Sequence, residues 1–289
     1  DVTASNGLVK QKPSIDKMIV DVPIGEALTD LEPNVGLNLP KHSIEQGNET
    51  RVFLPKFGVI KEKANNLHEV IRLSGMNLII DDFDHQLIIK VASIQSARLQ
   101  IYFIDNDEYF PKRVMFHDEN GNFLPNTEER MMFYCKGVIE TVKKLGWSPE
   151  IIHCQGWFSS LIPMYIKKIF NEDPLFKDTK VIYNVFDTEY QNSINPVIVE
   201  KLLYENNLEE SDLDLLRNPT FENLSKFAIS YSDAVIQGSE NINKNVLDCM
   251  KKSELPFMEY PGEEDYEDQY NNFFDSLVEE EELELTEEK

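Results

Sequence analysis

At residues 148–163 the chain reads Ser148-Pro149-Glu150-Ile151-Ile152-His153-Cys154-Gln155-Gly156-Trp157-Phe158-Ser159-Ser160-Leu161-Ile162-Pro163. The apolar residues of this run form the pattern of a short buried strand, and polar residues follow at once. A second apolar burst covers residues 180–185 and also ends in polar residues. In open α/β sheets, ligands bind in the crevice at the carboxyl ends of the strands. We therefore expect a ligand to contact Gln155, Gly156, Trp157 and Asp187.

Strand and helix patterns alternate on both sides of this stretch. Upstream, apolar bursts at residues 17–22 and 50–54 flank a short helix at residues 39–46, which is the start of a βαβ unit. Downstream, we expect strands at residues 234–237 and 257–260, and helices at residues 157–170, 195–206, 211–217, 221–231, 239–252 and 265–278, with Ser211 as an N-cap. The expected fold class is α/β, with a doubly wound, Rossmann-like, mostly parallel sheet.

One segment departs from this alternation. Between residues 68 and 106 apolar residues recur at every second position, as at Leu99, Ile101 and Phe103. That period is typical of strands. We expect an antiparallel hairpin insert beside the parallel sheet, a turn at residues 118–122, and then a helix at residues 128–145 that ends at Gly146.

The composition divides the chain into three parts. Residues 1–16 are polar and predict a flexible N-terminal lead, residues 17–262 carry the Rossmann-like domain, and residues 263–289 carry a C-terminal helix and an acidic tail. This last part holds 13 acidic residues and one lysine, so it contributes −12 of the net charge of −24. Such blocks are usually solvated. A docking role for the tail stays open.

The composition also excludes several classes of function. A net charge of −24 repels nucleic-acid backbones and anionic membranes, so we expect no nucleic-acid partner and no membrane association. No window approaches 18 consecutive apolar residues, and the N-terminal residues lack the apolar core of a signal peptide. The three cysteines and five histidines show no disulfide or metal-ligand spacing. A cytoplasmic protein without a metal is expected.

Familiar catalytic motifs are absent. The chain contains neither G-x-G-x-x-G, nor G-x-x-x-x-G-K followed by Ser or Thr, nor G-x-S-x-G. His153 and Cys154 are neighbours on a strand and point to opposite faces, which favours a buried structural pair over a nucleophile and its base. Ser239 is either the N-cap of a helix or part of an anion site at the helix start. Trp157 either packs a helix or stacks on a sugar.

Several segments together carry a family resemblance. Residues 48–58 read Asn48-Glu49-Thr50-Arg51-Val52-Phe53-Leu54-Pro55-Lys56-Phe57-Gly58, and residues 149–157 run from Pro149 to Trp157, with Leu161-Ile162-Pro163 beyond them. They are similar to G-x-E-V-R-V-x-x-P-x-Y-G, P-D-(I/V)-(I/V)-H-x-H-D-W and L-x-P of the bacterial starch and glycogen synthases. Residues 185–192 and 225–235 resemble the I-H-N, Y-Q-G and L-K-x-G-I-x-x-A-D-x-V segments of the same family. The matches span about residues 17–250.

This resemblance implies the N-terminal half of a GT-B glycosyltransferase. In that family, glucose passes from ADP-glucose, a substrate and not a cofactor, to an α-1,4-glucan in a cleft between two Rossmann-like domains; no cofactor is expected. The resemblance makes Asp187 the candidate catalytic residue. It also implies a substrate-binding set composed of Gly36, Gln155, Trp157, Tyr190 and Gln191.

The sequence departs from the family pattern at functional positions. No lysine lies near residues 32–37, where the family has K-x-G-G-L. Gln155 and Gly156 replace the second histidine and the aspartate of H-x-H-D-W, and Phe186 replaces the histidine of I-H-N. We also expect no second Rossmann domain after the acidic tail. The leading hypothesis is therefore a glucosyltransferase-like domain that is inactive alone.

Three functional hypotheses follow. In the first, the chain binds an α-glucan or a maltooligosaccharide, or completes a cleft with a separate protein partner. In the second, it keeps the family activity as a homo-oligomer that supplies both cleft walls, with Asp187 essential. In the third, it is a non-catalytic interaction protein whose acidic tail docks a basic partner.

Overall fold

The structure is a computed structural model that describes residues 16–20, 37–110, 115–205 and 207–287. Its strands, in chain order, are β1 (Asp16–Val20), β2 (Glu49–Pro55), β3 (His68–Glu69), β4 (Met76–Ile80), β5 (Phe83–Ile94), β6 (Leu99–Asp105), β7 (Ile151–Gln155), β8 (Lys180–Val185), β9 (Ala234–Gln237) and β10 (Phe257–Met258). The α-helices are α1 (Asn38–Glu45), α2 (Thr127–Leu145), α3 (Ile162–Met164), α4 (Ile198–Leu202), α5 (Phe221–Ser230), α6 (Lys244–Lys252) and α7 (Tyr266–Glu287). Four short helical segments complete the fold: the 3-10 helices η3 (Gln95–Ala97), η4 (Trp157–Ser159) and η6 (Glu210–Arg217), and the π-helix η5 (Tyr165–Ile169).

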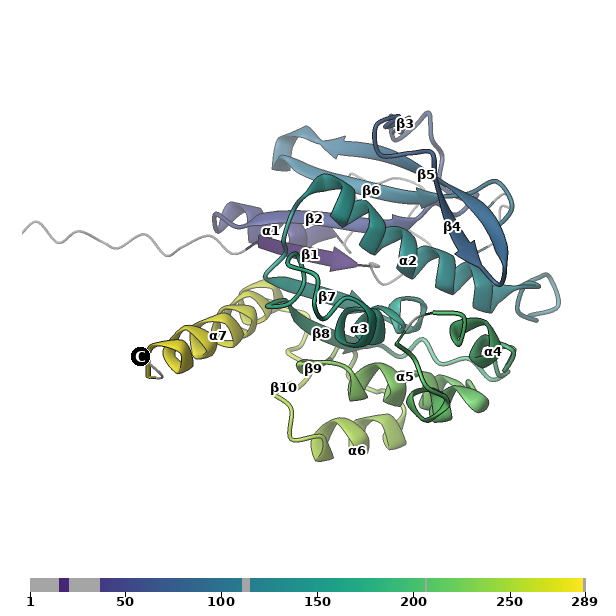
Figure 1. Cartoon of the computed structure of the whole chain (residues 1–289). Helices are drawn as coiled ribbons and strands as arrows, with labels where there is room; N and C mark the ends of the chain where they lie inside the picture. Colours follow the sequence, from purple (N-terminus) through teal and green to yellow (C-terminus); the bar gives the residue numbers. More distant parts are fainter. Residues whose placement is uncertain (1–15, 21–36, 111–114, 206, 288–289) are drawn as a thin grey trace, which may run out of the picture.

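A single twisted sheet forms the centre of the molecule (Figure 1). Its strand order is β10-β9-β8-β7-β1-β2-β6-β5-β3, and every pairing from β10 to β6 is parallel. The chain builds β1, β2 and β6 toward one edge, and then crosses back to place β7, β8 and β9 on the other side of β1. The strand order therefore reverses between β1 and β7, and such switch points are where open α/β sheets bind ligands.

Helices cover the sheet. Figure 1 shows α2 and α3 crossing in front of it, while α1 and α7 contact one another. All five residues of β7 are buried, as expected for a parallel strand covered on both faces. The core cluster runs from Leu37 to Leu277, so residues of α7 belong to the same core as the sheet. The expected doubly wound α/β fold is confirmed.

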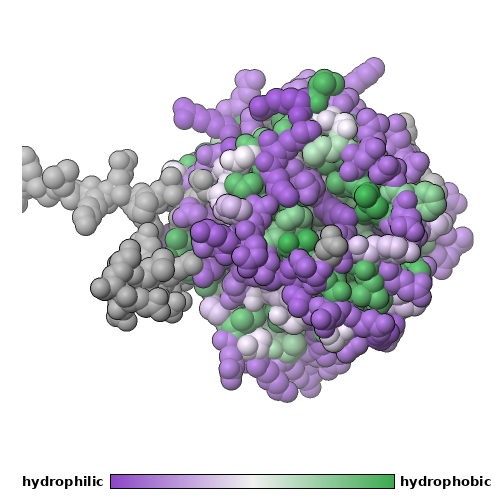
Figure 2. All heavy atoms as spheres, in the orientation of Figure 1, coloured by the Kyte–Doolittle hydropathy of each residue, from purple (hydrophilic) through white to green (hydrophobic). Residues whose placement is uncertain are grey.

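The antiparallel insert lies where the period-two pattern predicted it. Strand β5 pairs antiparallel with both β4 and β6, and β6 joins the parallel sheet at β2. Exposed apolar side chains on this insert include Ile79 and Phe83. On the face seen in Figure 2, hydrophobic residues stand in small groups among hydrophilic ones.

Glycines and turn residues end the elements as expected. Gly146 follows α2 with φ of +62°, the left-handed conformation common after helices, and its N–H bonds to the carbonyl of Lys143. The turn at residues 118–122 is built by Asp118, whose Oδ1 accepts the backbone N–H groups of Asn120 and Asn122 at 2.9 Å. These hydrogen bonds also hold the pKa of Asp118 below its usual value.

Some predicted helices were wrong in their bounds. The helix expected at residues 157–170 is divided into η4, α3 and η5, and the helix expected at residues 195–206 is only α4. Ser211 is not an N-cap: η6 begins at Glu210, and Glu209 caps it by exchanging hydrogen bonds with Asp212. Conversely, α7 continues to Glu287, well past the predicted end at residue 278.

Two absences among the described residues bear on function. In this part of the chain, no helix is both long and apolar enough to cross a membrane. The same residues contain no group of three or more His, Cys, Asp or Glu side chains that could hold a metal ion.

Candidate functional site

A cavity of about 500 Å³ opens at the carboxyl ends of β7 and β8, beside the switch point of the sheet. These two strands are parallel neighbours, with Gln155 opposite Asn184. Three segments line the cavity: the loop before α2 (Met115, Phe116, His117 and Gly121), the end of β7 with η4 (Gln155 to Phe158), and the loop after β8 (Phe186 and residues 188–192). We call this cavity the crevice.

The crevice begins at an unusual backbone turn. Gly156 has φ of +77° and ψ of 175°, a region that only glycine adopts without strain. Its N–H donates to the carbonyl of Asn184 at 3.0 Å, so the chain leaves β7 while still attached to β8. This turn brings Trp157 back toward the sheet, where η4 starts.

Trp157 is part of a cluster of aromatic rings. It is only 5% exposed, and its ring centre lies 4.7 Å from that of Phe116, 5.7 Å from Phe123, 5.4 Å from Phe158 and 5.2 Å from Tyr190. Because neighbouring rings surround the indole, packing is its main role. Trp157 forms part of the wall of the crevice, and its indole has no open face on which a ligand could stack.

Tyr190 continues this wall. Its hydroxyl donates to the carbonyl of Pro219 at 3.3 Å, and burial raises its pKa well above the usual value. Its ring also meets Phe123 and Phe221 edge to face. Tyr190 therefore offers a ligand its ring edge, because its hydroxyl already has an acceptor within the protein.

The polar side chains that line the crevice are three amides, the imidazole of His117, the hydroxyls of Thr188 and Tyr190, and the carboxylate of Glu189. Gln191 is exposed beside Asn192, and Gln155 is buried at the floor. Glu189 accepts a hydrogen bond from Asn243 at 3.0 Å. None of the described lining residues is a lysine or an arginine. Such a lining suits a neutral, hydroxyl-rich ligand, because neutral polar groups and aromatic edges carry no charge to balance an anion.

Asp187 lies at the rim and not among the residues that line the cavity. Its side chain is exposed, and Ser239 holds it: the Ser239 hydroxyl donates to Asp187 Oδ1 at 3.1 Å and accepts the Asp187 backbone N–H at 3.2 Å. The structure thus brings five predicted residues into one cavity, with Asp187 outside its lining: Gln155, Gly156, Trp157, Tyr190 and Gln191. Gly36 lies outside the described residues.

Both predictions for Ser239 were wrong. Helix α6 begins five residues later, at Lys244, and its N-cap is Asn243, whose Oδ1 accepts the N–H groups of Asn245 and Val246. Ser239 is therefore neither a helix cap nor part of a helix-terminal anion site. The prediction for His153 and Cys154 holds, since His153 is 1% exposed and Cys154 is fully buried.

One wall of the crevice was not predicted from the sequence. Phe116 and His117 come from the loop before α2, where His117 stacks on Phe123 at 4.6 Å. The available signal was the pair of phenylalanines that flank the predicted turn at residues 118–122. Phe186 also lines the cavity, and its ring rests on Gly238, where a Cβ atom would lie 2.6 Å from Phe186 Cε1.

Comparisons with known proteins agree with this architecture. A family model described as the starch synthase catalytic domain matches residues 34–255. The glycogen synthase of Chlorobium limicola is 34% identical over 169 residues, which are 58% of this chain and 35% of that protein. The glycogen synthase of Chlorobaculum tepidum is 31% identical over 213 residues, which are 73% of this chain and 43% of that protein.

Among solved structures, the catalytic domain of starch synthase IV from Arabidopsis thaliana bound to ADP and acarbose superposes with a TM-score of 0.67. The two are 14% identical, and the match covers 86% of this chain and 51% of the other, so it establishes the fold alone. The matched region spans less than half of the length of each of the two bacterial relatives. The resemblance found in the sequence is confirmed, and the chain belongs to the starch synthase catalytic domain family, as a glycogen/starch synthase-like glycosyltransferase domain.

Proposed function

We propose that this domain holds the α-glucan acceptor in the crevice and does not transfer glucose by itself. The observation that carries the proposal is the lining of the crevice, which combines aromatic walls with the amides of Gln155, Gln191 and Asn192. Sugar hydroxyls pair well with amides, and the aromatic ring edges of the wall give the apolar C–H groups of a sugar a surface to pack on. The Arabidopsis domain was solved with both ADP and acarbose, so the fold accommodates such ligands in that protein.

The second half of the proposal concerns the nucleotide. A diphosphate needs positive charge, and the described lining residues offer Glu189 but no lysine or arginine. Transfer chemistry depends on positioning and on electrostatic stabilisation of the charge that develops. We therefore propose that another domain or a partner chain supplies the cations for ADP-glucose, and that this domain is an acceptor-side component in the cytoplasm.

Two titrations test the proposal. Maltoheptaose added to the purified 289-residue chain is expected to bind saturably, whereas ADP-glucose is not. Incubation with both ligands is expected to release no ADP above the rate without protein. ADP release by this chain alone would overturn the inactive half of the proposal, and a flat maltoheptaose titration would overturn the acceptor half.

A pair of variants links the binding to the crevice. Gln191→Ala removes an exposed amide from the lining, so its affinity for maltoheptaose is expected to fall by roughly 2- to 12-fold, the value of one hydrogen bond. Gln86→Ala removes an equally exposed amide from β5, away from the crevice, and should leave the affinity unchanged. Equal effects in both variants would place the binding elsewhere.

The proposal assigns Asp187 a role only in the complete cleft. Its carboxylate is held at the rim by Ser239, outside the lining of the crevice. If a nucleotide-binding partner or a homo-oligomer restores transfer, Asp187→Ala should abolish that transfer while maltoheptaose binding persists. Unchanged transfer in the variant would exclude Asp187 from the reaction.

A further inference from the structure

A row of polar side chains runs beneath the crevice and ends on α7. The amide nitrogen Nε2 of Gln155 lies 3.3 Å from His153 Nδ1, and the other ring nitrogen, Nε2, lies 3.3 Å from Asn184 Nδ2. Asn184 Nδ2 in turn lies 2.8 Å from the hydroxyl of Tyr270. All four residues are at most 5% exposed, so their hydrogen bonds must come from one another or from a molecule in the crevice.

The imidazole of His153 limits how these groups can pair. Its ring is enclosed by the rings of Tyr270 and Phe274, and burial lowers its pKa to about 3, so it is neutral. A neutral imidazole has one N–H donor and one acceptor nitrogen. Only one of the two flanking carboxamides can therefore donate to the ring. The other carboxamide must direct its oxygen toward the ring N–H, so a half turn of that side-chain amide exchanges the positions of its nitrogen and oxygen.

The surroundings of Asn184 show which amide donates. Both hydrogens of its Nδ2 have acceptors, namely His153 Nε2 and the Tyr270 hydroxyl. Its Oδ1 is buried without a hydrogen-bond donor and faces Gly238, where a Cβ would lie only 2.3 Å away. The Oδ1 atom of Asn184 fits at this place because it contacts the Cα–H group of Gly238, a weak hydrogen-bond donor. A half turn of Asn184 would press two buried N–H groups against that Cα–H without any acceptor, which is the costlier arrangement.

The orientation of Asn184 then fixes the others. His153 Nε2 accepts from Asn184, so the single proton of the imidazole lies on Nδ1 and is donated to the oxygen of Gln155. We propose that His153, Asn184 and Tyr270 are positioning residues that turn the amide N–H of Gln155 into the crevice, as a hydrogen-bond donor to an oxygen of the bound ligand. The ligand's identity as a sugar rests on the proposed function, whereas the proton position does not.

The proton position can be measured in the free protein. Long-range ¹H–¹⁵N NMR distinguishes the two neutral tautomers, and the signals of His153 are those that disappear in His153→Gln. We expect the Nδ1–H tautomer, unchanged from pH 8 to pH 5, because the buried ring of His153 stays neutral over this range. An Nε2–H tautomer would overturn the proposal whether or not the protein binds a glucan.

One variant is expected to reverse the direction of the hydrogen bonds along this row of side chains. In Asn184→Asp the side chain has no N–H and can only accept, so the proton should move to His153 Nε2 and Gln155 should present its oxygen to the crevice. Persistence of the Nδ1–H tautomer in the folded variant would overturn the role of Asn184. If the variant does not fold, the tautomer in the unaltered protein still decides the proposal.

The donor role has its own binding test. Gln155→Glu keeps the size and the oxygen that accepts from His153, but it loses the N–H group, so the affinity for maltoheptaose should fall about tenfold or more. Gln86→Glu makes the same change at an exposed position of β5 and should bind normally. Normal binding by Gln155→Glu would overturn the donor role. Absence of binding by the unaltered protein would overturn the proposed function and leave the tautomer result standing.

Discussion

Two substitutions relative to the family motifs have local reasons in the structure. Gly156 stands where the motif has an aspartate, and it adopts a backbone conformation that side chains resist. Phe186 stands where the family has a histidine, and its ring is seated on Gly238 in the crevice lining. These residues shape the crevice by backbone geometry and packing. They supply no charged or titrating group to it, which is consistent with a binding role.

The turn at Gly156 can be tested by adding a methyl group. Gly156→Ala should lower the free energy of unfolding by about 1–3 kcal/mol, because alanine is strained at this φ and ψ even though no atom lies within 4 Å of the new Cβ. Urea denaturation measures this loss. Gly146→Asn is the control: Gly146 has φ of +62° and ψ of 32°, which asparagine tolerates, so a smaller loss is expected. Equal losses would contradict the strain argument.

The buried His153 predicts a pH dependence of stability. Burial lowers its pKa to about 3 in the folded protein, whereas an unfolded chain has a histidine pKa of about 6.5. Between these values the unfolded state binds a proton that the folded state does not. The free energy of unfolding should therefore fall as the pH drops below about 6.5, by up to about 1.4 kcal/mol per pH unit from this residue.

Urea denaturation at pH 7, 6 and 5 measures that slope. Because carboxylates also contribute, the informative quantity is the difference in slope between the unaltered protein and His153→Gln, which lacks this contribution. Gln86→Ala alters an exposed amide of β5, which does not titrate, and should keep the full slope. A His153→Gln slope as steep as that of the unaltered protein would mean that His153 is protonated in the folded state.

At the scale of elements, the sequence predicted best where an apolar burst has clear polar limits. The strands expected at residues 180–185 and 234–237 are β8 and β9 without any shift. The spacing of apolar residues predicted one helix at residues 157–170, but the segment is divided into η4, α3 and η5. Pro163 lies at the start of α3 and has no N–H to donate to a preceding turn, and apolar spacing does not register this missing hydrogen bond.

The crevice, too, was predictable only in the part that local sequence patterns describe. Gln155 and Trp157 could be grouped because they stand at the end of a predicted strand, whereas Tyr190 and Gln191 were joined to them by the family resemblance. The wall from Phe116 and Phe123 depends on packing between segments distant in sequence, and periodicity carries no information about such contacts.

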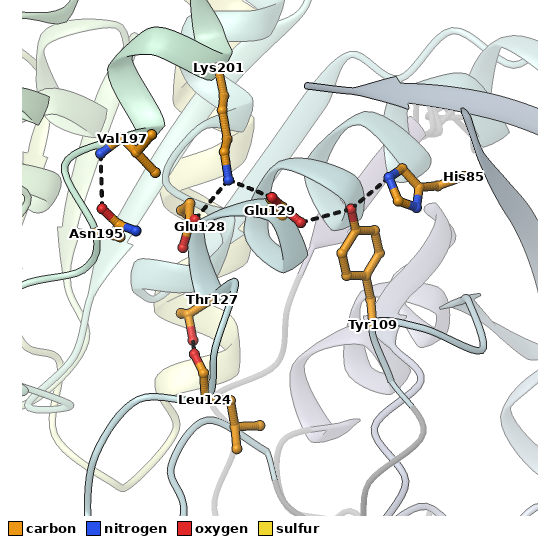
Figure 3. A network of polar contacts seen from close by, with 9 residues as sticks. All are labelled: His85, Tyr109, Leu124, Thr127, Glu128, Glu129, Asn195, Val197 and Lys201. Carbon is orange, nitrogen blue, oxygen red and sulfur yellow. Dashed lines mark hydrogen bonds and ion pairs between the residues drawn. The ribbon is translucent and has the colours of Figure 1, made fainter. Parts of the chain in front are cut away.

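A buried ion pair connects α4 to α2. Figure 3 shows Lys201 pointing toward Glu128 and Glu129 at the start of α2. Burial alone would lower the pKa of Lys201, but the hydrogen bonds to Glu129 and Glu128 raise it above its usual value. Figure 3 also shows Glu129 accepting from the hydroxyl of Tyr109, which contacts His85 at 3.0 Å. The row of contacts ties α4, α2 and β5 together.

Removal of the lysine should be costly. Lys201→Met leaves Glu128, whose side chain is 4% exposed, without its cation, so we expect a loss of roughly 3–5 kcal/mol in the free energy of unfolding. Chemical denaturation measures the loss, and adding Glu128→Gln should restore part of it. Lys226→Met breaks a more exposed pair with Glu222 and should cost about 1 kcal/mol or less. Similar losses for the two lysine variants would show that burial does not matter here.

At the scale of the whole molecule, α7 belongs to the folded domain. The composition placed a boundary at residue 263, and that division stays a prediction, yet Tyr270, Phe274 and Leu277 are buried in the same core as the sheet. His42 of α1 also contacts Asp268 of α7 at 2.7 Å. The helix thus covers the face of β7 to which His153 points, and it contributes Tyr270 to the row of side chains beneath the crevice.

Truncation separates the core part of α7 from its acidic end. Deleting residues 263–289 removes Tyr270, Phe274 and Leu277, and each such buried side chain contributes about 1.5–3 kcal/mol, so the sum approaches the 5–15 kcal/mol that holds a whole domain together. We expect this truncation to lower the Tm sharply and to expose surface that binds a hydrophobic dye. Deleting only residues 279–289 keeps all three side chains and should leave the Tm nearly unchanged, although it removes most of the acidic run. If the longer deletion also melted normally, α7 would be an appendage and His153 would need another cover.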